Sequence, residues 1–183
     1  MNLANKISIA RIISIPFFIA AIVYSRMDLA LLVFILAVVS DGVDGFVART
    51  LKQKTQLGTI LDPIADKMLL MSAYICFSVA SNIPGHLRLP PYVPIVVISR
   101  DVMIVLGSVI IYLIKGDIKV SPSILGKVTT FFQMITIVCI LVQFRHSLLV
   151  WNIAVVLTVI SGIDYVLKGS RLLSDGNVTK GRQ

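Results

Sequence analysis

The sequence predicts an all-α integral membrane protein with about six transmembrane helices and both termini in the cytoplasm. The first reason is composition: 57% of the 183 residues are hydrophobic and only 14% are charged. The mean hydropathy is +0.94, a balance that soluble domains do not show. Second, apolar residues gather in runs of roughly 20, the length of a membrane-spanning helix. Third, basic residues lie almost entirely on one side of these runs.

Six apolar runs are the predicted spans, and turn-forming segments such as Pro84-Gly85 and Pro90-Pro91 separate them. The runs occupy most of the chain, so we expect one membrane domain over residues 1–170 and a polar C-terminal tail over residues 171–183. In order, the runs are Ile7–Tyr24, Leu29–Phe46, Ile64–Ala80, Val93–Ile114, Val128–Phe144 and Leu148–Val166.

Each run has a feature of its own. The first follows two basic residues, as the apolar part of a signal peptide does, but no clear small-residue cleavage site follows it, so we expect a retained helix. A cluster of aspartates ends the second run and begins the third, across a polar connection from Arg49 to about Leu61. The fourth run contains Arg100-Asp101, Lys127 precedes the fifth, and Asp164 lies near the end of the sixth.

The distribution of lysine and arginine predicts the orientation. Because basic loops remain in the cytoplasm, the side with most of these residues is predicted to be cytoplasmic, and it includes both termini and the aspartate cluster. Arg100 lies within a span, and Arg26, Arg88 and Arg145 lie on the far side. The cytoplasmic set is Lys6, Arg11, Arg49, Lys52, Lys54, Lys67, Lys115, Lys119, Lys127, Lys168, Arg171, Lys180 and Arg182.

The net charge of +8 could also indicate a nucleic-acid partner. The basic residues lie in short loops beside apolar runs, however, as topology signals and contacts with anionic membrane lipids do. We therefore expect membrane lipids as partners and no nucleic acid.

Four aspartates between the second and third runs predict a metal site. Asp41 and Asp44 are three residues apart and Asp62 and Asp66 are four apart, so each pair shares one face of a helix. An antiparallel helix pair would bring the four carboxylates together. The set offers only oxygen ligands, which suits Mg²⁺ or Mn²⁺ and disfavours zinc. Two such ions would form a clamp for the displacement of a phosphoryl group.

The residues around the aspartates fit a bound phosphate. Gly42, Gly45, Ala48 and Gly58 leave space for a ligand close to the backbone, and Arg49 can offer a bidentate fork to a phosphate. The alternative is a solvated edge at which the aspartates pair with Lys52, Lys54 and Lys67. Four aspartates at helical spacings with interleaved small residues favour the metal site.

The segment Asp41–Asp66 resembles the signature of the CDP-alcohol phosphatidyltransferases, D-x2-D-G-x2-A-R-x8-G-x3-D-x3-D, without a departure. The resemblance implies that an acceptor hydroxyl attacks the β-phosphorus of a CDP-linked lipid and that CMP leaves. It also implies that all four aspartates bind metal and that Asp66 is the base for the acceptor hydroxyl. The residues implied in binding the CDP-lipid in this segment are Gly45, Ala48, Arg49, Thr55 and Gly58.

The opening segment Asn5-Lys6-Ile7-Ser8-Ile9-Ala10-Arg11 resembles the N-x-L-T-x-x-R segment of the same family, with Ser8 in place of threonine. The family analogy places Asn5, Lys6, Ile7 and Ser8 near the nucleotide. The alternative is that Asn5 caps the first helix and the basic residues set the topology.

Arg100 and Lys127 are candidates for binding the acceptor. Charges within a span usually face a bundle interior or a wet cavity. Arg100 could hold the acceptor's phosphate with Asp101 orienting it, or the two could form a structural ion pair between helices. Lys127 could reach an anionic acceptor or serve only to set topology. Asp164 is expected to be structural, with Lys168 as its partner.

Within the family, the chain is most similar to the bacterial phosphatidylglycerophosphate synthases, whose acceptor is sn-glycerol 3-phosphate and whose donor is CDP-diacylglycerol. This resemblance implies a homodimer in the bacterial inner membrane, and the distribution of basic residues predicts that the active site is on the cytoplasmic side. A cardiolipin synthase, with phosphatidylglycerol as acceptor, is the alternative within the family, and it would need an apolar groove for a lipid entering sideways. Transfer to inositol phosphate or serine is less favoured.

A divalent-cation channel or transporter is the alternative from another class. A conduction pathway would place charge near the membrane midplane. Here the acids lie at one membrane edge, which favours an interfacial enzyme.

Overall fold

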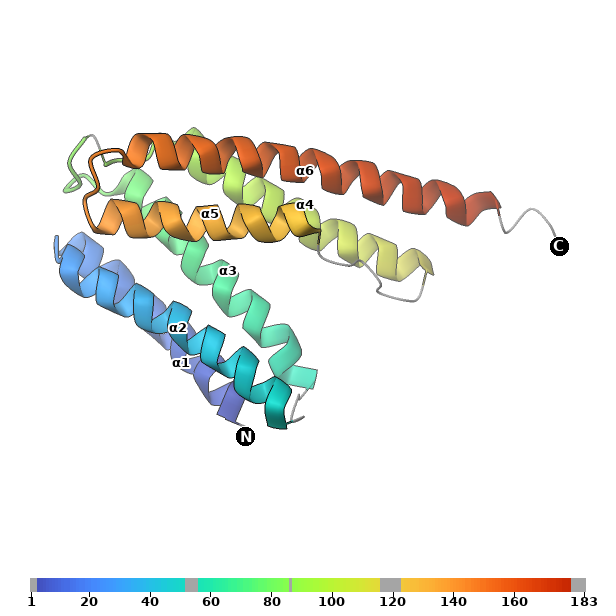
Figure 1. The fold of residues 1–183 in the computed structure, drawn as a ribbon, viewed down its shortest axis with the longest axis horizontal. Coiled ribbons are helices and arrows are strands. Elements are labelled where there is room, and N and C mark those ends of the chain that lie inside the picture. Colours follow the sequence, from blue (N-terminus) through green and yellow to red (C-terminus); the bar gives the residue numbers. More distant parts are fainter. Residues whose placement is uncertain (1–2, 52–55, 86, 116–122, 179–183) are drawn as a thin grey trace. The chain divides into compact units, whose positions relative to one another are not determined.

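The computed structural model describes the backbone of residues 3–51, 56–85, 87–115 and 123–178, and the side chains of residues 9–40, 65, 67–85, 87–107, 109, 113 and 123–170. Helices are the only regular secondary structure in this part of the chain (Figure 1). They are α1 (Leu3–Val23), α2 (Met27–Leu51), α3 (Gln56–Val79), α4 (Tyr92–Lys115), α5 (Ile124–Leu141) and α6 (Ser147–Val178). The all-α prediction is confirmed.

The helices follow the six predicted runs in order, but several of their ends differ from the prediction. The expected polar connection from Arg49 to Leu61 is wrong, because α2 continues to Leu51 and α3 begins at Gln56. Helix α6 continues to Val178, into the segment predicted to be a polar tail. Hydropathy detects only the apolar part of a helix, so polar turns at its ends escape the prediction.

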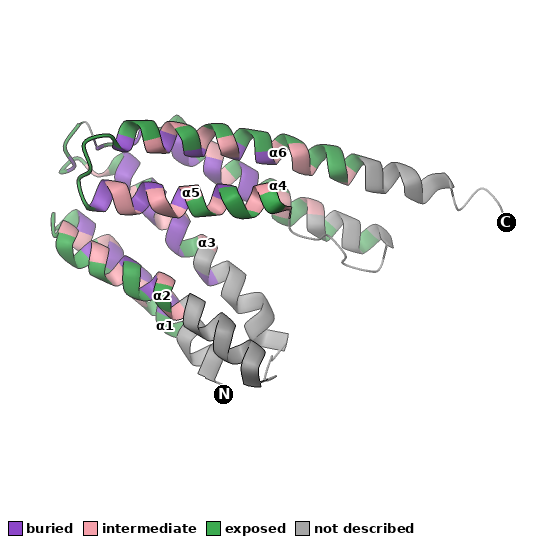
Figure 2. Ribbon diagram, in the orientation of Figure 1, coloured by how far each residue is buried: buried purple, intermediate pink, exposed green. Residues whose placement is uncertain are grey.

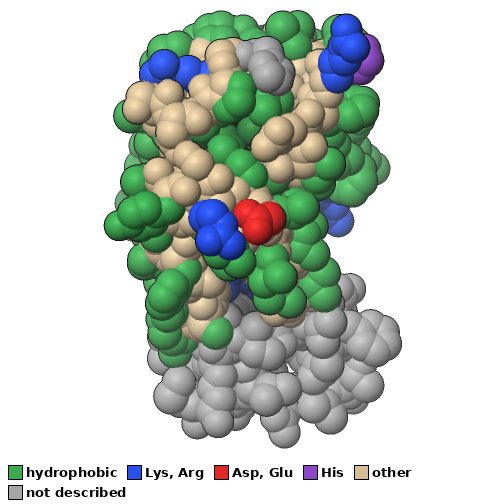
Figure 3. Space-filling view, turned by 90° about the vertical axis from the view of Figure 1, so that its left-hand side faces the viewer, with side chains coloured by type: hydrophobic (Ala, Val, Ile, Leu, Met, Phe, Trp, Pro, Cys, Tyr) green, Lys and Arg blue, Asp and Glu red, His purple; other side chains and the backbone are tan. Residues whose placement is uncertain are grey.

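Two helices in the described part of the chain are long and apolar enough to cross a membrane. They are Ile124–Leu141 of α5 and Ser147–Ser170 of α6. Shorter apolar helical stretches occur at Ile9–Val23, Met27–Ser40 and Lys67–Val79. On the face shown in Figure 3, hydrophobic side chains prevail among the described residues and charged ones are few.

The chain divides into two compact units. The first unit comprises residues 1–94 and 137–148, and the second comprises residues 95–136 and 149–183. In the first unit, α1 packs against both α2 and α3. Phe18 of α1 and Phe34 of α2 are buried, with ring centroids 5.8 Å apart, and buried positions also run along α3 (Figure 2). This interior is mainly apolar, as its sequence predicts.

Hydrogen bonds fix the helix ends of the first unit. Ser25 has a positive φ of 59°, and the N–H of Arg26 donates to the carbonyl of Ala21 at 2.8 Å, the pattern of a Schellman helix end. Nδ2 of Asn82 donates to the carbonyl of Ile22 at 2.7 Å. Arg88 donates through Nε to the carbonyl of Ser78 at 3.0 Å. The segment between α3 and α4 therefore ties the ends of α1 and α3 together.

In the second unit, a tyrosine and a glycine set the approach of α4 and α6. The hydroxyl of Tyr165 in α6 donates to the carbonyl of Ile104 in α4 at 2.9 Å. A Cβ atom at Gly107 would lie only 2.8 Å from Cε1 of Tyr165. The ring therefore occupies the space that the missing side chain of Gly107 leaves open.

Polar side chains join α5 and α6. Gln133, which is fully buried, donates through Nε2 to Oγ1 of Thr158 at 3.0 Å. Oγ1 of Thr129 lies 3.2 Å from the carbonyl oxygen of Leu157. Interhelical hydrogen bonds of this kind are common between apolar helices.

Candidate functional site

The four aspartates occupy facing ends of two consecutive helices. Asp41 and Asp44 lie within the last three turns of α2, and Asp62 and Asp66 lie within the first three turns of α3. Figure 1 shows the end of α2, the start of α3 and the start of α1 at the same end of the first unit. The fold thus brings the three segments with candidate site residues to one end of the first unit. The side chains of the four aspartates lie outside the described residues.

The predicted CDP-lipid contacts follow the same helices. Asn5, Lys6, Ile7 and Ser8 lie in the first turns of α1, Gly45, Ala48 and Arg49 lie near the end of α2, and Gly58 lies in the first turn of α3. Their side chains are also outside the described residues, as is Thr55 altogether. Among the side chains that the structure does describe, no three His, Cys, Asp or Glu come together as a metal site.

A second group of charged residues lies inside the second unit. Arg100 and Asp101 of α4 are 5% and 2% exposed. Nη1 of Arg100 donates to Oδ1 of Asp101 at 2.8 Å, and Nη2 donates to Oγ of Ser161 in α6 at 2.7 Å. Nε of Arg100 is buried and has no hydrogen-bond partner within the described part of the chain. An unsatisfied buried donor calls for an explanation, such as a ligand.

The first turn of α5 closes this group. Oγ of Ser123 accepts a hydrogen bond from the N–H of Gly126 at 3.0 Å, which caps the N-terminus of the helix. A Cβ atom at Gly126 would lie 3.1 Å from Nη2 of Arg100. The positive end of the α5 dipole therefore adjoins the guanidinium group. Lys127 is the next residue, and its side chain is exposed.

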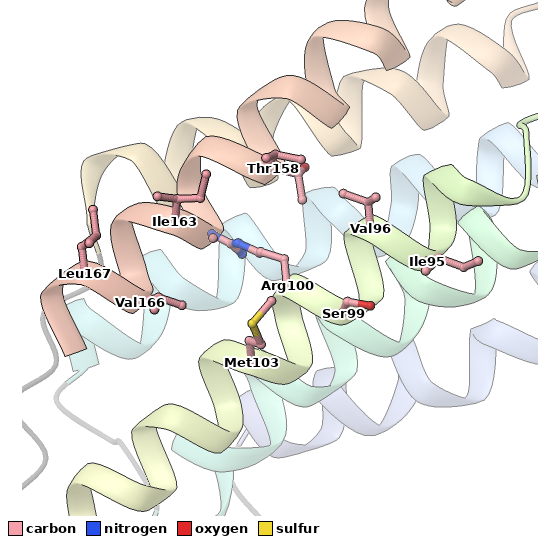
Figure 4. A pocket seen from close by; sticks show the side chains of 11 residues that line it. Ile95, Val96, Ser99, Arg100, Met103, Thr158, Ile163, Val166 and Leu167 are labelled. Atoms are coloured by element: carbon pink, nitrogen blue, oxygen red, sulfur yellow. The ribbon is translucent and has the colours of Figure 1, made fainter. Parts of the chain in front are cut away.

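An apolar groove of about 420 Å³ lies between α4 and α6 in the second unit (Figure 4). Its walls are almost entirely apolar, and Arg100 supplies the one charged side chain among them. Cγ of Arg100 would lie 3.7 Å from a Cβ atom at Gly162. The lining residues are Ile95, Val96, Ser99, Arg100, Met103, Thr158, Val159, Gly162, Ile163, Val166 and Leu167.

The expected pairing of Asp164 with Lys168 is confirmed, with Nζ of Lys168 2.7 Å from Oδ2 of Asp164. Arg100 and Asp101 also form an ion pair, but it joins neighbouring residues of α4 and not two helices, and the role of Arg100 in binding the acceptor stays a prediction. The contacts of Ser161 and Gly126 with Arg100 were not predicted from the sequence. The sequence does show small residues beside apolar stretches, namely Ser161, Gly162 and Gly126, but it does not connect them with Arg100.

Comparison with known proteins identifies the family. The model of the CDP-alcohol phosphatidyltransferase family matches residues 1–161. The chain belongs to this family. The match includes the signature segment Asp41–Asp66 and reaches through Arg100, Gly126 and Ser161. A CDP-alcohol phosphatidyltransferase is an enzyme, which agrees with the prediction.

Three curated relatives of this phosphatidyltransferase carry the name CDP-diacylglycerol–glycerol-3-phosphate 3-phosphatidyltransferase. The Aquifex aeolicus protein is 30% identical over 181 residues, covering 94% of this chain and 98% of that protein. The Bacillus subtilis protein is 33% identical over an alignment of 202 residues, covering 96% and 99%. The Haemophilus influenzae protein is 32% identical over 181 residues, covering 93% and 96%.

Proposed function

We propose that this protein transfers the phosphatidyl group of CDP-diacylglycerol to a hydroxyl of sn-glycerol 3-phosphate, releasing CMP and giving phosphatidylglycerophosphate. The observation that carries the proposal is the complete signature from Asp41 to Asp66 in a chain that aligns over nearly its full length with relatives named for this reaction. It acts in phospholipid biosynthesis.

We further propose how the protein lies in the membrane. All six helices cross, both termini are cytoplasmic, and residues 1–170 form one membrane domain with a tail over residues 171–183. The excess of lysine and arginine on one side supports this orientation. The protein is a homodimer in the bacterial inner membrane, with its active site on the cytoplasmic side.

Members of this family generally depend on a divalent metal ion, and the donor set fits Mg²⁺ or Mn²⁺. Asp41 and Asp44 come from α2 and Asp62 and Asp66 from α3, an all-oxygen set of four carboxylates that hard cations prefer. When bound, two such ions would neutralise the charge of the diphosphate. Chelation with EDTA should abolish CMP release, and added Mg²⁺ or Mn²⁺ should restore it.

Different residues of this chain bind the donor and accept the proton. The CDP-lipid is bound by Asn5, Lys6, Ile7, Ser8, Gly45, Ala48, Arg49, Thr55 and Gly58. Asp66 accepts the proton of the acceptor hydroxyl. The acceptor oxygen forms a bond to the β-phosphorus while the bond from that phosphorus to the CMP oxygen breaks, and CMP leaves with the electron pair of that bond.

Arg100 and Lys127 bind the phosphate of the acceptor. Asp101 and Ser161 engage two of the five N–H donors of the Arg100 guanidinium, so donors remain for an anion. The orphaned Nε and the adjacent N-terminus of α5 both favour negative charge here. These features support an anionic acceptor over serine.

The groove between α4 and α6 supports a second candidate function, that of a cardiolipin synthase with phosphatidylglycerol as acceptor. A lipid acceptor needs apolar space beside its phosphate, and this groove has Arg100 in its wall. The resemblance of the whole chain to phosphatidylglycerophosphate synthases still favours glycerol 3-phosphate.

The deciding experiment is CMP release by the purified protein in detergent micelles with CDP-diacylglycerol and Mg²⁺ or Mn²⁺. Glycerol 3-phosphate, phosphatidylglycerol, inositol phosphate and serine are supplied separately. The proposal predicts release with glycerol 3-phosphate. Release only with phosphatidylglycerol would identify the second candidate. Divalent-ion flux in sealed liposomes, with no CMP release from any acceptor, would instead indicate a channel.

A further inference from the structure

We infer that Ser161 and Gly126 are positioning residues that fix the Arg100 guanidinium in the orientation in which it binds the acceptor's phosphate. The inference rests on the proposed function, since it concerns the same acceptor. It adds two residues, from α6 and α5, to a site whose charged members were visible in the sequence.

Asp101 alone cannot fix the guanidinium. Consecutive helical residues do not face each other, so Arg100 must fold back to reach Oδ1 of its neighbour at 2.8 Å. One anchor at Nη1 leaves the plane of the group free to turn about that contact. The hydroxyl of Ser161 holds the other terminal nitrogen, Nη2, at 2.7 Å from a different helix. Two anchors on two nitrogens define the plane.

Gly126 leaves room for the same nitrogen. A Cβ atom there would lie 3.1 Å from Nη2, closer than most side-chain contacts allow. The glycine therefore lets Nη2 approach the first turn of α5 while it remains bonded to Ser161. Residues of α4, α5 and α6 thus meet at one atom. Phosphate recognition by arginine depends on such geometry because its bidentate fork is directional.

Stability alone does not account for this arrangement. Desolvating a buried ion pair can cost as much as the attraction returns, so such a pair is weak support for a purely structural role. Arg100 is 5% exposed and adjoins a helix N-terminus, where the dipole disfavours a cation. The same surroundings favour an arriving anion. An arginine held in this place is suited to bind one.

The test is the steady-state KM for each substrate in Ser161→Ala. We expect the KM for glycerol 3-phosphate to rise about tenfold, as for loss of one hydrogen bond to a charged group, with the KM for CDP-diacylglycerol within about twofold of wild type. Ser161→Thr, which keeps the hydroxyl, should restore the acceptor KM. Gly126→Ala should raise it in the same way.

Control variants lie on α6, the helix that contains Ser161. Ser170 is exposed and bonds only locally, to the carbonyl of Leu167, and a Cβ atom added at Gly169 would have no neighbour within 4 Å. Ser170→Ala and Gly169→Ala should leave both KM values unchanged. An unchanged acceptor KM in Ser161→Ala would overturn the inference. An equal rise in both KM values, or no rescue by threonine, would also overturn it.

A second measurement separates this inference from the proposed function. If wild type releases no CMP with glycerol 3-phosphate, the proposed function fails, and inorganic phosphate becomes the probe. With EDTA present to exclude the metal site, millimolar phosphate should raise the thermal midpoint of wild type. The rise should be smaller for Ser161→Ala. No rise in wild type, or equal rises in both proteins, would overturn the inference.

Discussion

The two units of the molecule place their polar residues differently. In the first unit, the described interior is apolar apart from Arg11, Ser78 and Ser147, and the predicted metal-binding aspartates lie toward the ends of α2 and α3. In the second unit, the interior itself contains Arg100, Asp101 and a set of hydroxyl and amide groups. That set is Thr129, Gln133, Thr136, Thr158 and Ser161.

This difference suits two kinds of ligand. Metal ions and a nucleotide come from water, so the proposed metal site agrees with carboxylates toward helix ends. A charge within an apolar bundle is costly unless partners compensate it, and Arg100 has Asp101 as counter-ion and the Ser161 hydroxyl as hydrogen-bond acceptor. This difference agrees with the proposal that residues of the first unit act on the reacting phosphates and that residues of the second recognise the acceptor.

The largest expected effect is that of Asp66→Asn in the first unit. An amide cannot accept the proton of the acceptor hydroxyl, so CMP release should fall by about 10² to 10⁴-fold, while binding of the donor is partly retained. Initial rates of CMP release and a donor-binding titration measure the two effects. Asp28→Asn is the matched control, because Asp28 is exposed and lies 3.7 Å from Arg26. Full activity in Asp66→Asn would remove this residue as the base.

A smaller effect is expected from Gly107→Ala in the second unit. The new methyl group would meet the Tyr165 ring at 2.8 Å, so α4 and α6 must separate, at a cost of about 1–3 kcal/mol in the free energy of unfolding. Gly169→Ala, with open space around it, should instead gain about 0.5–1 kcal/mol. Thermal midpoints in one detergent compare them. Equal shifts would show that the Tyr165 contact does not set the helix spacing.

The smallest effect is expected from Gln133→Met. The change removes the hydrogen bond to Thr158 at similar volume, and such interhelical bonds contribute about 0.6 kcal/mol on average. The thermal midpoint should fall by only a few degrees. A loss comparable to that of Gly107→Ala would mean that the polar interior of the second unit chiefly stabilises the fold.

The two units also differ in what their sequence reveals. The aspartates of the first unit belong to two consecutive helices, so the fixed spacing from Asp41 to Asp66 makes them recognisable in the sequence alone. The contacts of the second unit join distant positions: Arg100 and Ser161 are 61 residues apart, and Gln133 and Thr158 are 25 apart. Only the packing of α4, α5 and α6 brings them together.

The positions of the helices were predictable because each helix contains an apolar run that stands out in the sequence. Their polar ends were not, as at Gln56 and Val178, since hydropathy carries no signal there. The groove between α4 and α6 was also beyond prediction, because it depends on how Gly162 and the stem of Arg100 pack.

The most direct test of this division of work is the KM for each substrate in Arg100→Ala, measured by CMP release. Loss of a charged hydrogen-bonding group should raise the KM for glycerol 3-phosphate about 10 to 100-fold, with the KM for CDP-diacylglycerol nearly unchanged. Arg100→Lys, which keeps the charge without the fork, should give an intermediate value. An unchanged acceptor KM in a folded variant, or an equal rise in both values, would contradict the account.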